Sequence, residues 1–134
     1  EVPYAPLTEL TAADFTAAWT QKALAQIDLV RTGLDHISAV GSFTLTSGIP
    51  SRDPVVGGAA AATVNGAIEA FVRAAAIEIA PRRINVVSPS ILTESLDAFG
   101  DFFPGFTPVD AAVVARGFQK AVEGAATGQT ITLP

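Results

Sequence analysis

The sequence predicts an α/β fold in which helices alternate with about three parallel strands. Three segments rich in β-branched or aromatic residues, 42–47, 84–88 and 130–133, are short and bracketed by turn residues, as strands are. Each follows a longer segment whose apolar residues recur at spacings of three and four, the period of a helix. The connections are long enough for parallel pairing and contain no hairpin signal, so helices are expected to flank a parallel sheet.

The first helix is predicted over residues 11–36. Thr11 is placed as its N-cap, with Asp14 as the capping-box partner. One face carries an apolar stripe, which should turn towards the core: Phe15, Trp19, Ala23, Ile27, Val30 and Leu34. The opposite face carries polar residues: Lys22, Gln26 and Arg31.

An alanine-rich helix is predicted over residues 59–80, where Pro81 ends it. Its main apolar face includes Val64, Ile68 and Val72, and a second face consists of small residues, so burial on both sides is expected. The small-residue face comprises Ala67, Ala70 and Ala74.

The last helix is predicted over residues 107–124, with Thr107 as N-cap and Pro108 at the first helical position. The preceding segment, 89–106, contains several Pro and Gly residues and is expected to be a loop with one helical turn. The first strand, 42–47, carries no Lys, Pro or bulge signal that would protect a free edge, so something should pair with it.

Composition excludes several classes of function. A net charge of −5 with eight Lys and Arg residues leaves no basic surface for nucleic acid. The longest apolar run, 55–62, is too short to cross a bilayer, so no membrane partner is expected. The chain has no Cys and one His, which excludes disulfides and a Cys or His metal site. A cytoplasmic location fits these features.

Residues 41–93 resemble the short-chain dehydrogenase/reductase superfamily, and the specific part is 65–93, NGAIEAFVRAAAIEIAPRRINVVSPSILT. The resemblance fixes a helix, a strand and the following loop in one order, and it implies a partial Rossmann-like, doubly wound parallel sheet. Residues 1–134 would then form a single partial domain, the carboxyl-terminal half of an NAD(P)-binding domain. The chain contains no Met, and its first half is expected to be missing.

The side chains that such enzymes use for catalysis are replaced in this sequence. Aligned without gaps, the family's Tyr falls on Ala61, its Lys on Asn65, its Ser on Gly48 and its Asn on Lys22. Those groups move a proton to or from the substrate oxygen during hydride transfer. An alanine cannot transfer a proton, so little or no turnover is expected, and none from this chain alone.

Neighbouring residues could take over part of the site. Ser47 precedes the expected serine by one position, although that offset points it to the other face of the strand unless the strand end bulges. Lys22 and Asn65 look like the family's Asn and Lys with their positions exchanged, the alternative being a solvated Lys and a buried Asn. The resemblance also implies a set of cofactor-binding residues: Pro89, Ser90, Ile91 and Thr93.

Three functions therefore stay open. The intact protein resembles an NAD- or NADP-dependent oxidoreductase acting on a small carbonyl or alcohol substrate, with this chain as its substrate-side half. The second is a non-catalytic relative that serves cofactor sensing or protein association, and the third is a stand-alone association module. The family pairs the helices that correspond to residues 11–36 and 59–80 across a twofold axis, which implies a homo-oligomer.

Overall fold

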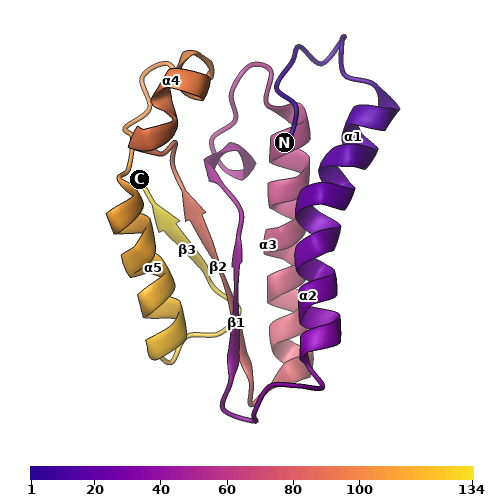
Figure 1. Ribbon diagram of the computed structural model, residues 1–134, viewed down its shortest axis with the longest axis vertical. Helices are drawn as coiled ribbons and strands as arrows, with labels where there is room; N and C mark the ends of the chain where they lie inside the picture. The colour runs from indigo at the N-terminus through magenta and orange to yellow at the C-terminus, as the bar shows by residue number, and fades with distance from the viewer.

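A three-stranded parallel sheet forms the centre of the molecule (Figure 1). The computed structural model describes all of residues 1–134. Strands β1 (Ser42–Thr46), β2 (Arg83–Pro89) and β3 (Thr130–Leu133) lie in that order, and both pairings are parallel. The expected α/β fold with parallel strands is confirmed.

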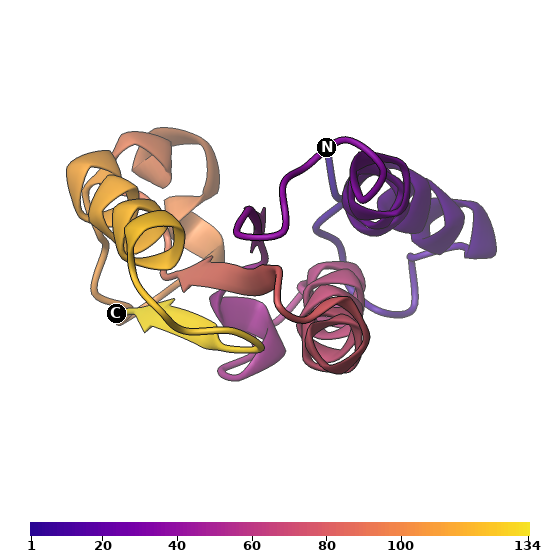
Figure 2. The ribbon, with the colours of Figure 1, turned by 90° about the horizontal axis from the view of Figure 1, so that it is seen from below.

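Helices cover both faces of this sheet. Figure 2 shows α5 (Ala111–Glu123) on one side and α3 (Ala59–Ile79), beside the helices of the first segment, on the other. The central strand β2 is buried throughout its middle because both of its faces are covered. This arrangement is the doubly wound parallel sheet that the sequence predicts.

Asn85 in β2 fixes the approach to the last strand. Its side chain is fully buried, its Nδ2 donates to the Ala126 carbonyl at 2.8 Å, and its Oδ1 accepts from the Gln129 amide at 3.1 Å. A polar side chain is stable in this interior because both of its ends are paired. The two bonds tie the loop that leads into β3 to the centre of the sheet.

The first helical segment contains a wider π-turn. It consists of α1 (Ala12–Ala18), the π-helical stretch Trp19–Leu24 and α2 (Ala25–Gly33). The predicted capping box is present, with the Asp14 amide donating to Thr11 Oγ1 at 3.2 Å and the Thr11 amide donating to Asp14 Oδ2 at 2.8 Å.

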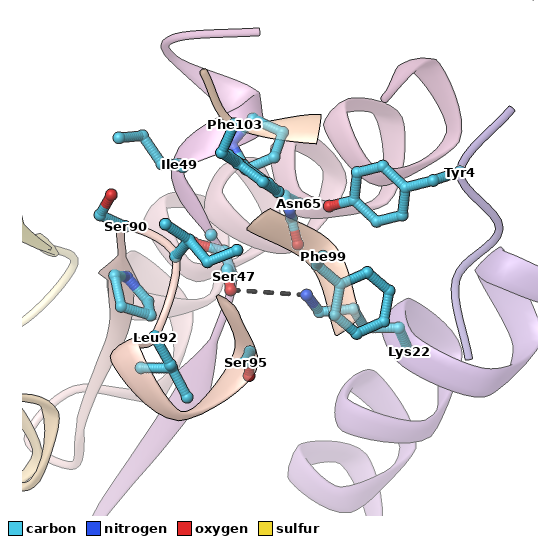
Figure 3. A pocket seen from close by; sticks show the side chains of 14 residues that line it. Tyr4, Lys22, Ser47, Ile49, Asn65, Ser90, Leu92, Ser95, Phe99 and Phe103 are labelled. Carbon is cyan, nitrogen blue, oxygen red and sulfur yellow. Dashed lines mark hydrogen bonds between the residues drawn. The ribbon is translucent and has the colours of Figure 1, made fainter. Parts of the chain in front are cut away.

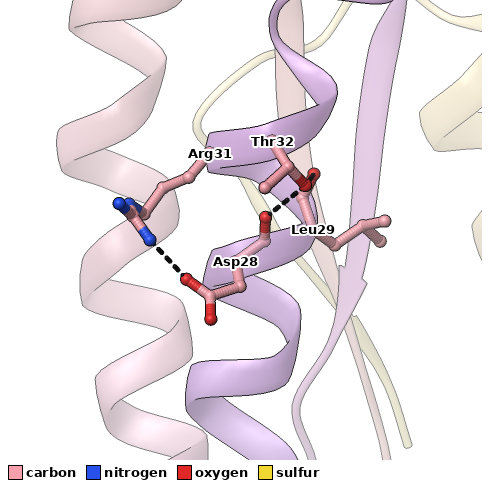
Figure 4. Close-up of polar contacts among 4 residues, drawn as sticks. All are labelled: Asp28, Leu29, Arg31 and Thr32. Carbon is pink, nitrogen blue, oxygen red and sulfur yellow. Dashed lines mark hydrogen bonds and ion pairs between the residues drawn. The ribbon is translucent and has the colours of Figure 1, made fainter.

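The predicted faces of this helix are wrong because of the π-turn. A π-turn contains more residues than an α-turn, so the side chains on either side of it point in other directions around the helix axis than regular spacing predicts. Trp19, expected in the apolar stripe, is 41% exposed, whereas Lys22 and Gln26 turn towards the sheet. Of the three polar residues assigned to the outer face, Arg31 alone is there, in an exposed ion pair with Asp28 at 2.6 Å (Figure 4).

Gln26 covers one end of the free edge of β1. Its Oε1 accepts from the Thr46 amide at 2.8 Å and its Nε2 donates to the Thr46 carbonyl at 2.9 Å, which are the bonds that a neighbouring strand would make. No strand lies on this side of β1. The free edge expected from the sequence is therefore protected only at its carboxyl end.

The start of α5 differs from the prediction. The helix begins at Ala111 with Asp110 as its N-cap, not at Thr107. Val109 is buried and forms a parallel bridge with Leu92, which holds this stretch extended and delays the helix. The segment before it contains more helix than expected, in three short pieces: Thr93–Ser95, α4 (Leu96–Phe99) and Gly100–Phe102.

Helix α3 buries its main apolar face and exposes most of the other. Val64, Ile68 and Val72 are buried against the sheet and first helices as predicted, but Ala70 and Ala74 are exposed, so burial on both sides is not observed. This helix is long and apolar enough to span a membrane by length and composition. Its packing against the sheet is that of a core helix.

Candidate functional site

A pocket of about 260 Å³ lies beyond the carboxyl ends of β1 and β2 (Figure 3). We call it the strand-end pocket. Open parallel sheets bind ligands at this edge, because the loops that follow the strands converge there. Its polar lining residues come from four separate segments: Lys22, Ser47, Asn65, Ser90 and Ser95.

Lys22 reaches this pocket from the π-helical stretch. Figure 3 shows its ammonium directed towards Ser47, whose carbonyl accepts from Nζ at 3.4 Å. Nζ makes no other hydrogen bond within the chain, so the ammonium keeps donors for a ligand. Burial lowers the pKa of Lys22 below its ordinary 10.5, and the charge of Glu69 opposes part of that shift.

Ser47 is held by a carboxylate. The residue continues the pairing of β1, because its amide donates to the Val87 carbonyl at 3.0 Å. Its Oγ donates to Glu69 Oε1 at 2.7 Å, and the same oxygen accepts from Ser51 Oγ at 2.8 Å. The hydroxyl proton of Ser47 is thus engaged in a partly buried network, which leaves only its lone pairs for a ligand.

Asn65 brings an unpaired acceptor to the pocket. It is 2% exposed, and its Oδ1 has no hydrogen-bond partner although it is buried. A β-carbon at Gly48 would lie 3.2 Å from Asn65 Nδ2, so the missing side chain at position 48 makes room for this amide. The structure therefore places Lys22 and Asn65 around one cavity, as the exchanged-position hypothesis requires, and Ser47 lines the same cavity.

The predicted cofactor-binding residues divide into two groups. Pro89, Ser90 and Ile91 line the pocket, and the buried Ser90 Oγ has no hydrogen-bond partner. Thr93 does not line it: its Oγ1 donates to Asp110 Oδ1 at 2.6 Å, in front of α5. The cofactor-binding role of Thr93 stays a prediction, and in this structure its side chain is bonded at the start of that helix.

Tyr4 is a pocket residue that sequence reasoning missed. Its ring lies near Phe99, Phe102 and Phe103, with centroid distances of 5.9, 5.1 and 6.0 Å. Figure 3 shows its hydroxyl pointing into the pocket on the side of Asn65. Burial raises the pKa of this phenol, which keeps it protonated at neutral pH.

Ala61 is the residue on which the sequence alignment places the family's tyrosine. It is buried and lines a hollow next to the pocket, together with Tyr4 and Lys22. Its side chain offers no hydroxyl to this hollow. The free polar groups of the site come from the first helical segment, from Asn65 and from the loop after β2.

Glu69 could have been found from the sequence. It follows Asn65 by four positions on a predicted helix, and that spacing puts both side chains on one face. Tyr4 gave no such signal, because it lies in a Pro-rich segment without periodicity.

Comparison with known proteins places this architecture among dehydrogenases. No family model matches the sequence. The short-chain dehydrogenase/reductase ATR9 of Stachybotrys chlorohalonatus is 38% identical over 79 residues, which are 59% of this chain and 29% of that protein. The chain thus spans less than a third of that relative's length.

Solved structures match over the whole chain. The protein lin1944 of Listeria innocua is 48% identical with a TM-score of 0.96, over 100% of this chain and 68% of that one. A small-chain dehydrogenase in complex with NADPH superimposes with a TM-score of 0.88 at 24% identity, over 99% of this chain and 67% of its own. The sequence relatives and the doubly wound sheet agree: the chain belongs to the short-chain dehydrogenase/reductase superfamily and covers part of that domain.

Proposed function

We propose that the intact protein binds NAD or NADP and oxidises an alcohol or reduces a small carbonyl compound at the strand-end pocket. One observation carries the proposal: Lys22 Nζ and Asn65 Oδ1 lie at this pocket with hydrogen-bonding capacity that the chain leaves unused, and Ser90, which also lines it, has a buried Oγ without a partner. Buried polar groups are normally paired, so unpaired ones around a cavity indicate a polar ligand.

The pocket residues fit the nicotinamide end of such a cofactor. Asn65 Oδ1 is an acceptor suited to a ribose hydroxyl, and Ser90 Oγ can donate to or accept from the carboxamide. Pro89 and Ile91 flank Ser90 and give the site an apolar surface. The bound cofactor would supply or accept the hydride. The NADPH complex of a structural neighbour supports this proposal at the level of the fold.

Lys22 would act on the substrate oxygen. An ammonium within a largely buried site stabilises negative charge that develops on a carbonyl oxygen during reduction, and it can donate a proton to that oxygen. Its lowered pKa favours this transfer, because an acid whose pKa lies nearer to neutrality gives up its proton more readily. Ser47 would hold the Lys22 ammonium through its carbonyl and remain bonded to Glu69.

A second candidate is a non-catalytic protein that binds the cofactor for sensing or association. The occupation of the family's Tyr and Ser positions by Ala61 and Gly48 favours it, as does the engagement of the Ser47 hydroxyl with Glu69. A stand-alone association module is the third candidate, which would bind no cofactor.

Two measurements on the full-length protein separate these functions. Titration with NADH and with NADPH, followed by fluorescence of the reduced nicotinamide, should show binding of one or both, and binding of neither would exclude the first two functions. A panel of simple ketones, aldehydes and alcohols then tests turnover. For the oxidoreductase, we expect Lys22→Met to lower kcat about 100-fold or more while Gln129→Ala, an exposed residue far from the pocket, has no effect. Absence of turnover with cofactor bound would favour the sensor.

We further propose that the protein is a cytoplasmic homodimer joined through the first helical segment and α3. In support, Ala70 and Ala74 are exposed small residues that permit close helix approach, and Leu29 and Ile77 are apolar side chains that are 59% and 84% exposed. Light scattering at micromolar concentration should give twice the protomer mass. A monomer would contradict the proposed interface.

A further inference from the structure

One side of the strand-end pocket is an aromatic wall, formed by Tyr4, Phe99 and Phe103. Phe99 and Phe103 come from the short helical pieces after β2, and Tyr4 comes from the amino-terminal segment. The next residue after Tyr4 is anchored to the turn before α3, since the Ala5 amide donates to the Gly57 carbonyl at 3.0 Å. The wall is therefore a fixed surface built from two distant parts of the chain.

Two further rings pack against Tyr4 and Phe103 and restrict their orientation. Phe102 lies against Tyr4 with a centroid distance of 5.1 Å, and Phe106 meets Phe103 edge to face at 5.4 Å. Neither Phe102 nor Phe106 lines the strand-end pocket. These two rings support the wall and leave its inner surface to a ligand.

Polar groups lie beside this wall in the same pocket. Lys22 keeps donors free, and it lines the adjoining hollow together with Tyr4 and Phe99. Figure 3 shows the Lys22 ammonium and the Tyr4 hydroxyl both directed into the pocket. Because the proposed function gives Asn65 and Ser90 to the cofactor, a second ligand that meets the rings and Lys22 needs a flat apolar body and an oxygen at one end.

We propose that the strand-end pocket takes an aromatic ketone or the corresponding aromatic alcohol, whose ring lies against the aromatic wall and whose oxygen lies towards Lys22. This inference rests on the proposed function, since it names the substrate class of the same pocket. The proposed function places the nicotinamide in part of this pocket, and the adjoining hollow, which Tyr4, Lys22 and Phe99 also line, extends the space beside the wall.

Planarity distinguishes this class from saturated ketones of equal size. A flat ring meets other rings edge to face or in an offset stack, and such a contact strengthens binding beyond the area it buries. Each contact corresponds to roughly a 2-fold to 10-fold gain in affinity. A saturated ring fills similar space but lacks the quadrupole that these contacts require.

Three matched probes test the inference: acetophenone, cyclohexyl methyl ketone and ethylbenzene. Their dissociation constants are measured by isothermal titration calorimetry on the full-length protein, with and without the nicotinamide nucleotide that binds. We expect acetophenone to bind at least about fivefold more tightly than the saturated ketone, which lacks the flat ring, and than ethylbenzene, which lacks the oxygen. Equal or tighter binding of either comparison probe would overturn the inference, as would failure of acetophenone to bind either form.

Two variants locate the effect. Phe103→Leu should abolish the preference for acetophenone over the saturated ketone, whereas Phe106→Leu, a like substitution in the same cluster outside the pocket, should preserve it. Nucleotide affinity should be unchanged in both. If the unmodified protein binds no nucleotide, the proposed function is contradicted. The preference for acetophenone can still be tested in that case, because it is also measured without nucleotide. An undiminished preference in Phe103→Leu would contradict the aromatic wall.

Discussion

Asn85 offers a quantitative test of how the sheet is held together. In Asn85→Ala, the Ala126 carbonyl loses its donor at 2.8 Å and the Gln129 amide loses its acceptor at 3.1 Å. Each hydrogen bond contributes about 1 kcal/mol net, and a buried group left without a partner costs about 1–3 kcal/mol. The loop between α5 and β3 is partly open to water, so each group left without a partner should cost an amount in the lower part of the range of about 1–3 kcal/mol. For the two groups together, we expect the free energy of unfolding to fall by about 3 kcal/mol.

A loss of that size is a large share of the roughly 5–15 kcal/mol that stabilises a typical domain. The free energy of unfolding is measured by urea denaturation of the full-length protein, followed by far-ultraviolet circular dichroism. The matched control is Gln129→Ala, which keeps the backbone amide held by Asn85 and removes only an exposed side chain. Its expected cost is below about 0.5 kcal/mol. A difference of less than about 1 kcal/mol between the two variants would refute the reasoning.

Three further predictions concern the pocket and the helices. Ser47→Ala should lower the free energy of unfolding by about 1.5–3 kcal/mol, because the hydroxyl donates to the Glu69 carboxylate; an unchanged urea midpoint would show that this bond contributes nothing. Burial lowers the pKa of Lys22 in the folded state, so between that lowered pKa and 10.5 the unfolded chain holds more protons than the folded one. The native protein should therefore gain stability relative to Lys22→Met as the pH rises through this window, and a pH-independent difference would contradict the assigned burial. Gly66→Ala should raise the free energy of unfolding by about 0.5–1 kcal/mol, since the added β-carbon meets open space. Gly117→Ala should give no gain, because the added β-carbon would lie 2.9 Å from a side-chain carbon. Equal urea midpoints for the two variants would rule out this packing.

The sheet could be predicted from the sequence because its signals are local. The strand segments around Leu45, Val86 and Ile131 are short, β-branched and bracketed by turn residues, and the alanine helix between the first two requires a crossover. The Thr11 and Asp14 capping box was equally readable, since it depends on residues three positions apart.

The corrections arise where distant contacts decide local structure. A periodicity of 3.6 residues cannot reveal the π-turn at Trp19–Leu24, and that turn moves Lys22 and Gln26 from the expected outer face towards the sheet. Similarly, Thr107 carries a good cap signal, but the bridge between Val109 and Leu92 keeps the chain extended past it.

The sequence predicted several residues of the strand-end pocket, but not the contacts that they make there. Alignment on the family pattern indicated Lys22, Ser47 and Asn65, and the fold brings them together because they follow β1 or face its end. The hydrogen bond from Ser47 to Glu69 and the arrival of Tyr4 from the amino-terminal segment depend on packing that no local pattern records.

The most direct test of the proposed function is a crystal structure of the full-length protein soaked with the nicotinamide nucleotide. We expect electron density for the nicotinamide and its ribose in the strand-end pocket, with hydrogen bonds to Ser90 Oγ and Asn65 Oδ1, the two buried atoms of pocket residues that lack partners. Clear density for the nucleotide at any other place, with both of these atoms still unpaired, would contradict the assignment of the pocket.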